Sequence, residues 1–74
     1  MFALSGQRVL ITGAAQGLGA GLARVFAGQG AELVLMDFDA EGLASVNAQI
    51  GGLAHLINVD LADADATQSA IEAL

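Results

Sequence analysis

A chain of 74 residues is long enough for one small domain, which would bury roughly 60% of the surface that the unfolded chain exposes. It is 55% hydrophobic and 14% charged, and 2 basic and 8 acidic residues give it a net charge of −6. So few cations exclude nucleic acid as a partner, because phosphate backbones are bound by basic surfaces. No apolar run approaches the roughly 20 residues that span a bilayer, so no membrane partner is expected. The chain has no cysteine, which excludes disulfides and thiolate metal sites and favours a cytoplasmic location.

The beginning of the chain predicts a strand, a tight turn and a helix. Residues 8–12, RVLIT, form a short run rich in β-branched residues that is closed by Gly13. From Gly17 to about Gln29, apolar residues recur at the spacing of one helix face. Glycines follow at the end of this segment, as they do at the ends of helices.

The remainder of the chain repeats this alternation twice. Residues 32–37, ELVLMD, predict a second strand. Asp39 can cap a second helix, which stops near Gly51, because its side chain can accept from the first free amides. Residues 54–59 predict a third strand, and Asp63 can cap a last helix.

The order of elements is therefore β-α-β-α-β-α. The first two strands are continuous apolar runs, which suit a parallel sheet covered on both faces. Right-handed crossovers place the first two helices on one face and leave the last helix for the other. The sequence predicts an α/β fold, a partial Rossmann-type doubly wound parallel sheet, in which residues 1–74 are the first half and end before a fourth strand. The edge that such a strand would occupy invites self-association.

Four glycines lie where the first helix begins. A strand, a glycine-rich turn and a helix N-terminus together form a site for an anionic phosphate, because free amides and the helix dipole point at it. We assign Gly13 to the turn, Gly17 to the approach of a ligand and Gly19 to close packing of helix on strand. For Gly21 a close helix contact is the preferred explanation.

The spacing of these glycines indicates which kind of phosphate-binding loop the chain has. The chain has no lysine, which excludes the G-x-x-x-x-G-K-[ST] loop, and Leu22 stands where G-x-G-x-x-G needs its third glycine. The pattern is instead Thr12-Gly13-x-x-x-Gly17-x-Gly19. The segment LITGAAQGLG resembles the cofactor loop of the short-chain dehydrogenase/reductase family, and FALSGQRVLITG resembles that family's N-terminal entry. The resemblance implies cofactor contacts along the loop, at Gly13, Ala15, Gln16, Gly17, Leu18 and Gly19.

An acid at the end of the second strand indicates which dinucleotide is bound. Asp37 follows Gly19 at close to the roughly 20-residue spacing expected of the acid that holds the adenosine ribose. A carboxylate accepts from both ribose hydroxyls and repels a 2′-phosphate. Phe38 follows Asp37 with no base nearby, and Gln16 stands where family members that prefer NADP often have a basic residue. We therefore expect NAD as the cofactor, in preference to NADP.

The segment DLAD, residues 60–63, resembles the family's Asp-x-x-Asp segment after the third strand. The resemblance implies that Asp60 and the backbone amide of Leu61 lie near the adenine. Asp63 is better explained as a helix cap.

The chain lacks the chemistry that the family uses for catalysis. The resemblance implies a tyrosine that exchanges a proton with the substrate and a lysine beside it, and the chain has neither residue. No catalytic residue is therefore assigned, and the chain alone is expected to be inactive. With His55 as the one histidine, no metal site is assigned. The family resemblance covers only the first third of a longer protein, which would be a homo-oligomeric oxidoreductase acting on an alcohol or carbonyl with NAD(H).

Two other functions remain open. The chain could be a nucleotide-binding or assembly module that never transferred hydride. It could also belong to an S-adenosylmethionine-dependent methyltransferase, because Gly17–Gly21 fits G-x-G-x-G. Against the methyltransferase, Thr12–Gly13 stands where that fold usually has an acid shortly before the glycines.

Overall fold

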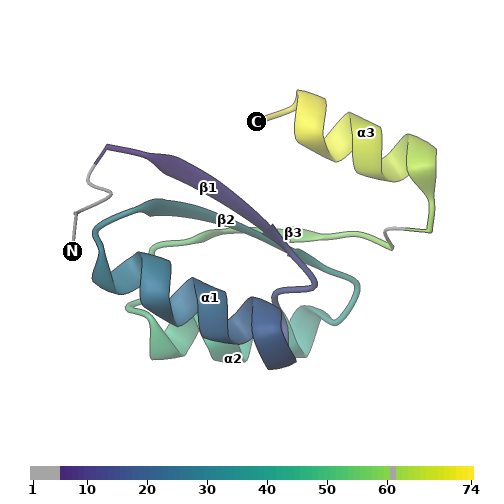
Figure 1. Cartoon of the computed structure of the whole chain (residues 1–74). Coiled ribbons are helices and arrows are strands. Elements are labelled where there is room, and N and C mark those ends of the chain that lie inside the picture. Colours follow the sequence, from purple (N-terminus) through teal and green to yellow (C-terminus); the bar gives the residue numbers. More distant parts are fainter. Residues whose placement is uncertain (1–5, 61) are drawn as a thin grey trace.

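The computed structural model describes residues 6–60 and 62–74, which form strands and helices in strict alternation (Figure 1). The strands are β1 (Arg8–Thr12), β2 (Glu32–Asp37) and β3 (His55–Asn58). The helices are α1 (Gly17–Gly28), α2 (Ala40–Gln49) and α3 (Ala64–Glu72). These bounds lie within one or two residues of the elements predicted from the sequence.

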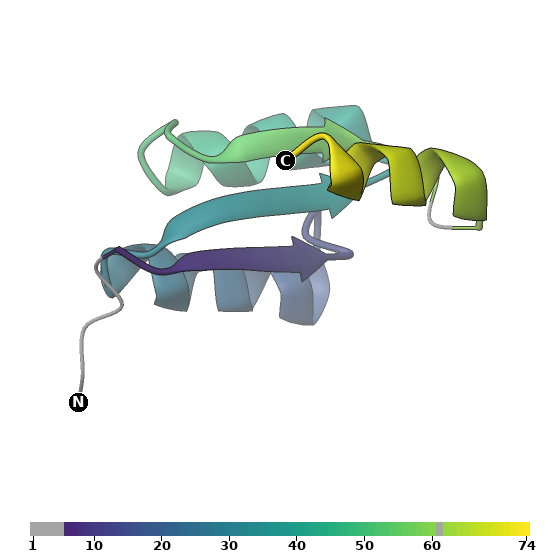
Figure 2. The same ribbon diagram turned by 90° about the horizontal axis from the view of Figure 1, so that it is seen from above.

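The described strands form one parallel sheet in the order β1-β2-β3, with Leu10 beside Val34 and Met36 beside Ile57. Helices α1 and α2 lie on one face and α3 lies on the other, as right-handed crossovers require (Figures 1 and 2). The predicted fold, a partial Rossmann-like α/β sheet, is confirmed.

The core lies between the sheet and the pair α1 and α2. Branched side chains from the sheet meet small side chains from α1, which allow the helix to approach the strands closely. The buried members of this core are Ile11, Ala14, Ala20, Ala23, Leu33, Leu35, Leu43 and Val46. This packing fixes the α1 N-terminus against the sheet.

The opposite face of the sheet is less well covered. Helix α3 has no buried residue, and Leu10 of β1 and Ile71 of α3 remain 40% and 43% exposed. The prediction of strands covered on both faces therefore holds for β2, which is buried from Leu33 to Asp37, and is wrong for β1. The physical reason is that α3, the helix on this face, buries no residue of its own, and that β1 has β2 as its single neighbour among the described strands.

In the part of the chain that the structure describes, no helix combines the length and apolar character needed to cross a bilayer.

Candidate functional site

The carboxyl ends of the strands and the N-termini of the helices meet at one edge of the sheet (Figure 1). Open α/β sheets bind their ligands at this edge, outside the carboxyl ends of the strands. The predicted site residues of the three loops, apart from those outside the described ranges, all lie here. The fold therefore brings together residues that are distant in the sequence.

The N-terminus of α1 is open, whereas the other described helices are capped. Gln16 occupies its N-cap position without a side-chain bond, and no acid lies in its first turn. In contrast, Asp39 accepts from Gly42 N in α2 and Asp63 accepts from Ala66 N in α3, each at 3.0 Å. A helix start without an acid keeps its partial positive charge, which favours an anion.

The first amides of α1 have no acceptor within the described chain. The first bond of the helix runs from Ala20 N to Gln16 O at 3.4 Å, so the amides of Gly17, Leu18 and Gly19 precede it. Neither backbone nor side chain of the described residues accepts from these three groups. Leu18 is 81% exposed. Three free donors at an exposed helix start can bind an anion.

Two glycines of the loop adopt a backbone conformation that other residues rarely take. Gly13 has φ 64° and Gly17 has φ 61°, in the left-handed region where a Cβ is penalised. A Cβ added at Gly17 would meet nothing within 4 Å among the described residues. The space in front of Gly17 is therefore open to a ligand, and the glycine shapes the turn at the same time.

Gly19 fits tightly against the loop that leaves β1. A Cβ built there would lie 2.8 Å from the carbonyl carbon of Gly13 and 3.1 Å from Cα of Ala14, and closer still to the Gly13 oxygen. The close packing predicted for Gly19 is thus present. The close contact predicted for Gly21 is not found, because a Cβ there meets nothing within 4 Å among the described residues.

Asp37 has a structural role that the sequence did not indicate. The residue is 8% exposed. Its Oδ2 accepts from Ala15 N at 3.1 Å, and its Oδ1 accepts from Asp39 N at 3.0 Å. The carboxylate therefore joins the loop after β1 to the loop after β2. Because a carboxylate has about four acceptor positions, these two bonds do not use its full capacity to accept. The amide of Ala15 is already engaged, so this residue links the loops rather than offering a free donor.

Sequence reasoning missed Asn58, at the end of β3. Its Nδ2 donates to the backbone oxygens of Asp37 at 3.1 Å and Phe38 at 2.8 Å. The available signal was a polar side chain at the end of an apolar strand, without a motif to distinguish it. Phe38 itself is 75% exposed beside the site.

The segment after β3 forms a turn that begins α3. Asp60 is exposed, its Oδ1 accepts from Ala62 N at 2.9 Å and its backbone oxygen accepts from Asp63 N at 2.9 Å. Asp63 caps α3 as predicted. Leu61 lies outside the described residues. In those residues no group of three or more histidine, cysteine or acidic side chains could hold a metal ion.

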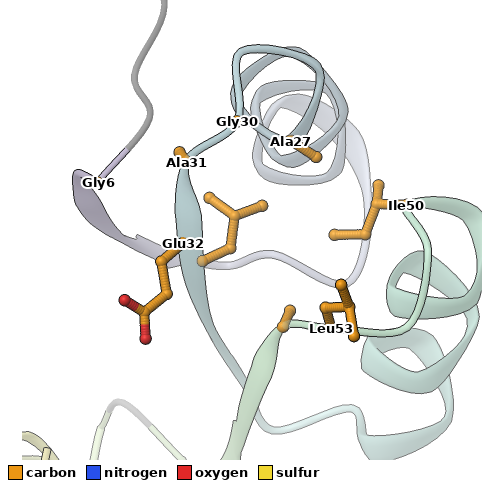
Figure 3. A pocket seen from close by; sticks show the side chains of 9 residues that line it. Gly6, Ala27, Gly30, Ala31, Glu32, Ile50 and Leu53 are labelled. Atoms are coloured by element: carbon orange, nitrogen blue, oxygen red, sulfur yellow. The ribbon is translucent and has the colours of Figure 1, made fainter.

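A cavity of about 460 Å³ lies at the opposite end of the sheet, where β2 and β3 begin (Figure 3). Its lining is mostly apolar, with Ala27, Ile50 and Leu53 among the side chains. Its charged residue, Glu32, points away from Ile50 and Leu53 (Figure 3) and pairs with Arg8 at 3.4 Å. Ligands of open α/β sheets bind at the other edge, and this cavity offers few polar groups to orient one.

Comparison with known proteins agrees with this geometry. Residues 7–74, nearly the whole chain, match the family model described as short chain dehydrogenase. The chain belongs to the short-chain dehydrogenase family. Its relatives include D-threitol dehydrogenase of Mycolicibacterium smegmatis, which is 42% identical over 76 residues, 99% of this chain and 29% of that protein.

Solved structures of similar proteins have the same fold. The 3-ketoacyl-(acyl-carrier-protein) reductase of Brucella melitensis, in complex with NADH, is 38% identical with a TM-score of 0.87, over 96% of this chain and 29% of that one. A metagenomic short-chain oxidoreductase in complex with NADP is 38% identical with a TM-score of 0.86, over 93% of this chain and 33% of that one. The chain thus spans about a third or less of the length of these proteins.

Proposed function

We propose that this chain binds the ADP half of NAD as the N-terminal part of a short-chain dehydrogenase. The longer enzyme, called the full-length protein below, would transfer hydride between NAD(H) and an alcohol or carbonyl substrate. The free amides at the start of α1 are the observation on which this proposal rests. They would donate to the diphosphate, and the dipole of α1 would add attraction.

The roles within the loop follow from the backbone. The amides of Gly17, Leu18 and Gly19 would contact the diphosphate, and Gln16 would lie at its side. Gly13 would permit the turn, and Ala15 would hold the loop through Asp37, its partner at 3.1 Å. After β3, Asp60 and Leu61 would lie near the adenine.

The preference for NAD over NADP is supported by the charges around Asp37. This carboxylate would accept from the ribose hydroxyls, and it would repel a 2′-phosphate. The bases of the chain are Arg8 and Arg24. Arg8 pairs with Glu32 at the opposite edge, and Arg24 donates to Gln49 at 2.9 and 3.1 Å. No base of this chain is therefore placed to neutralise a 2′-phosphate.

The reaction needs groups that this chain does not contain. NAD would supply hydride acceptance, and this chain would hold and orient its adenosine end. A short-chain dehydrogenase exchanges the substrate proton through a tyrosine that a lysine assists, and this sequence has neither. The substrate and the proton-transfer groups would belong to the rest of the full-length protein.

The proposal is tested by calorimetric titration of the full-length protein with NADH, NADPH and S-adenosylmethionine. NADH should bind most tightly, NADPH more weakly and S-adenosylmethionine not at all. Binding of S-adenosylmethionine alone would establish the methyltransferase alternative. Dinucleotide binding without turnover of any alcohol would favour the non-catalytic module.

Replacing Asp37 by alanine should weaken NADH binding about 10- to 100-fold, because hydrogen bonds to a charged group contribute about 1.5–3 kcal/mol. NADPH binding should weaken less, so discrimination between the two should decrease. Asp63→Ala is the control, because it removes a carboxylate that accepts from a backbone amide, that of Ala66, and that is assigned to capping α3 rather than to the ribose. An unchanged preference in Asp37→Ala would show that this acid does not contact the ribose.

A further inference from the structure

Asn58 ties the end of β3 to the end of β2. Its Nδ2 donates to Asp37 O at 3.1 Å and to Phe38 O at 2.8 Å. Asp37 O also accepts from Val59 N at 3.1 Å. The oxygen of Phe38 has no other donor among the described residues. The peptide after Phe38 is therefore held at its oxygen by Asn58 and at its nitrogen by Oδ1 of Asp37.

The peptides that Asn58 holds lead directly to the carboxylate of the candidate site. Asp37 receives Ala15 N on Oδ2 and Asp39 N on Oδ1. The start of α2 also lies close to the phosphate loop, since a Cβ built on Gly42 would be only 2.7 Å from the Cβ of Ala15. A rotation of the backbone at Asp37 would thus move both the carboxylate and the phosphate loop that it holds.

We propose that Asn58 is a positioning residue of the nucleotide site, which sets the direction of the Asp37 carboxylate without contacting the ligand. This inference rests on the proposed function above. Its physical basis is that the side-chain amide of Asn58 donates to the carbonyl groups before and after Phe38 and so restrains the peptide planes on both sides of this residue. A positioned carboxylate meets both ribose hydroxyls, whereas one that rotates does so only part of the time.

The selectivity for NADH over NADPH distinguishes positioning from simple stabilisation. Asn58→Ala should lower the affinity for NADH about fivefold, which corresponds to a typical net hydrogen bond. The affinity for NADPH should change less, because the carboxylate opposes the 2′-phosphate. A purely structural role would lower both affinities equally or change neither.

The matched control is Asn47→Ala, at the opposite end of the sheet. Asn47 Oδ1 accepts from Ala54 N at 3.0 Å in a partly buried bond, so this variant loses a comparable amide bond away from the candidate site. Asn58→Leu keeps the approximate size of the side chain and removes its donors without adding a charge, and it replaces Asn58→Ala if that variant does not fold. Binding is measured in the full-length protein by calorimetry, and folding by thermal melting.

A double-mutant cycle completes the test. In the Asp37→Ala background, Asn58→Ala should no longer change the NADH-to-NADPH ratio, because the carboxylate through which it acts is gone. The inference is overturned if a folded Asn58 variant keeps the wild-type ratio, or if the ratio changes equally in both backgrounds. If the wild-type protein binds neither dinucleotide, the proposed function fails and this inference fails with it. NADH binding by the wild type with no effect at Asn58 overturns the inference alone.

Discussion

Replacing Gly17 by valine should lower the affinity for NADH at least 100-fold. Gly17 has φ 61°, where a β-branched residue is strongly disfavoured. The side chain of the introduced valine would also enter the open space before α1, where the diphosphate is proposed to lie. The loss of two charge-assisted bonds, at about 1.5–3 kcal/mol each, is enough for a change of this size.

The control for backbone strain is Gly51→Val. Gly51 has φ 105°, and a Cβ there likewise meets nothing within 4 Å among the described residues, but it follows α2 at the opposite edge of the sheet. Both variants should lose stability, and only Gly17→Val should lose binding. Calorimetric titration of the two full-length proteins with NADH provides the comparison. Wild-type affinity in Gly17→Val would refute the assignment of the loop.

Replacing Gly19 by alanine should destabilise the full-length protein by about 1–3 kcal/mol, the usual cost of overpacking. The added methyl group would collide with the backbone of Gly13 and Ala14, which cannot move aside as a flexible side chain can. Helix α1 would then tilt away from the sheet and carry its free amides with it. Weaker NADH binding should accompany the loss of stability.

Gly21→Ala is the matched control for this change. Gly21 lies two positions further along the same helix, and a Cβ added there meets nothing within 4 Å among the described residues. The variant gains up to about 1 kcal/mol of helix propensity. Urea unfolding should therefore show opposite shifts for the two alanine variants. Equal shifts would mean that Gly19 does not approach the loop closely.

The elements could be predicted because their signals are local. The apolar runs of β1 and β2 and the capping acids Asp39 and Asp63 act within a few residues of where they stand. Gly13 and Gly19 were also predictable, because a turn and a close approach need glycine in a recognisable pattern.

The rest of the site could not be predicted, because it depends on strands that meet only in the fold. Ala15 and Asp37 are separated by 22 residues in the sequence, and Asn58 and Asp37 by 21. Nothing near Asp37 in the sequence indicates that two backbone amides already use its oxygens. The free edge of the sheet was expected from the missing fourth strand, but the exposure of Leu10 on a face of β1 was not, since an apolar run does not reveal how fully a helix covers it.

In the proposed function, the free amides of Gly17, Leu18 and Gly19 hold the diphosphate. Amide NMR of the isotope-labelled full-length protein during titration with ADP tests it most directly. We expect these three amides to show the largest chemical-shift changes, with smaller changes at Asp37 and Phe38. Unchanged resonances at the start of α1, with the shifts gathered instead around the apolar cavity near Leu53, would contradict it.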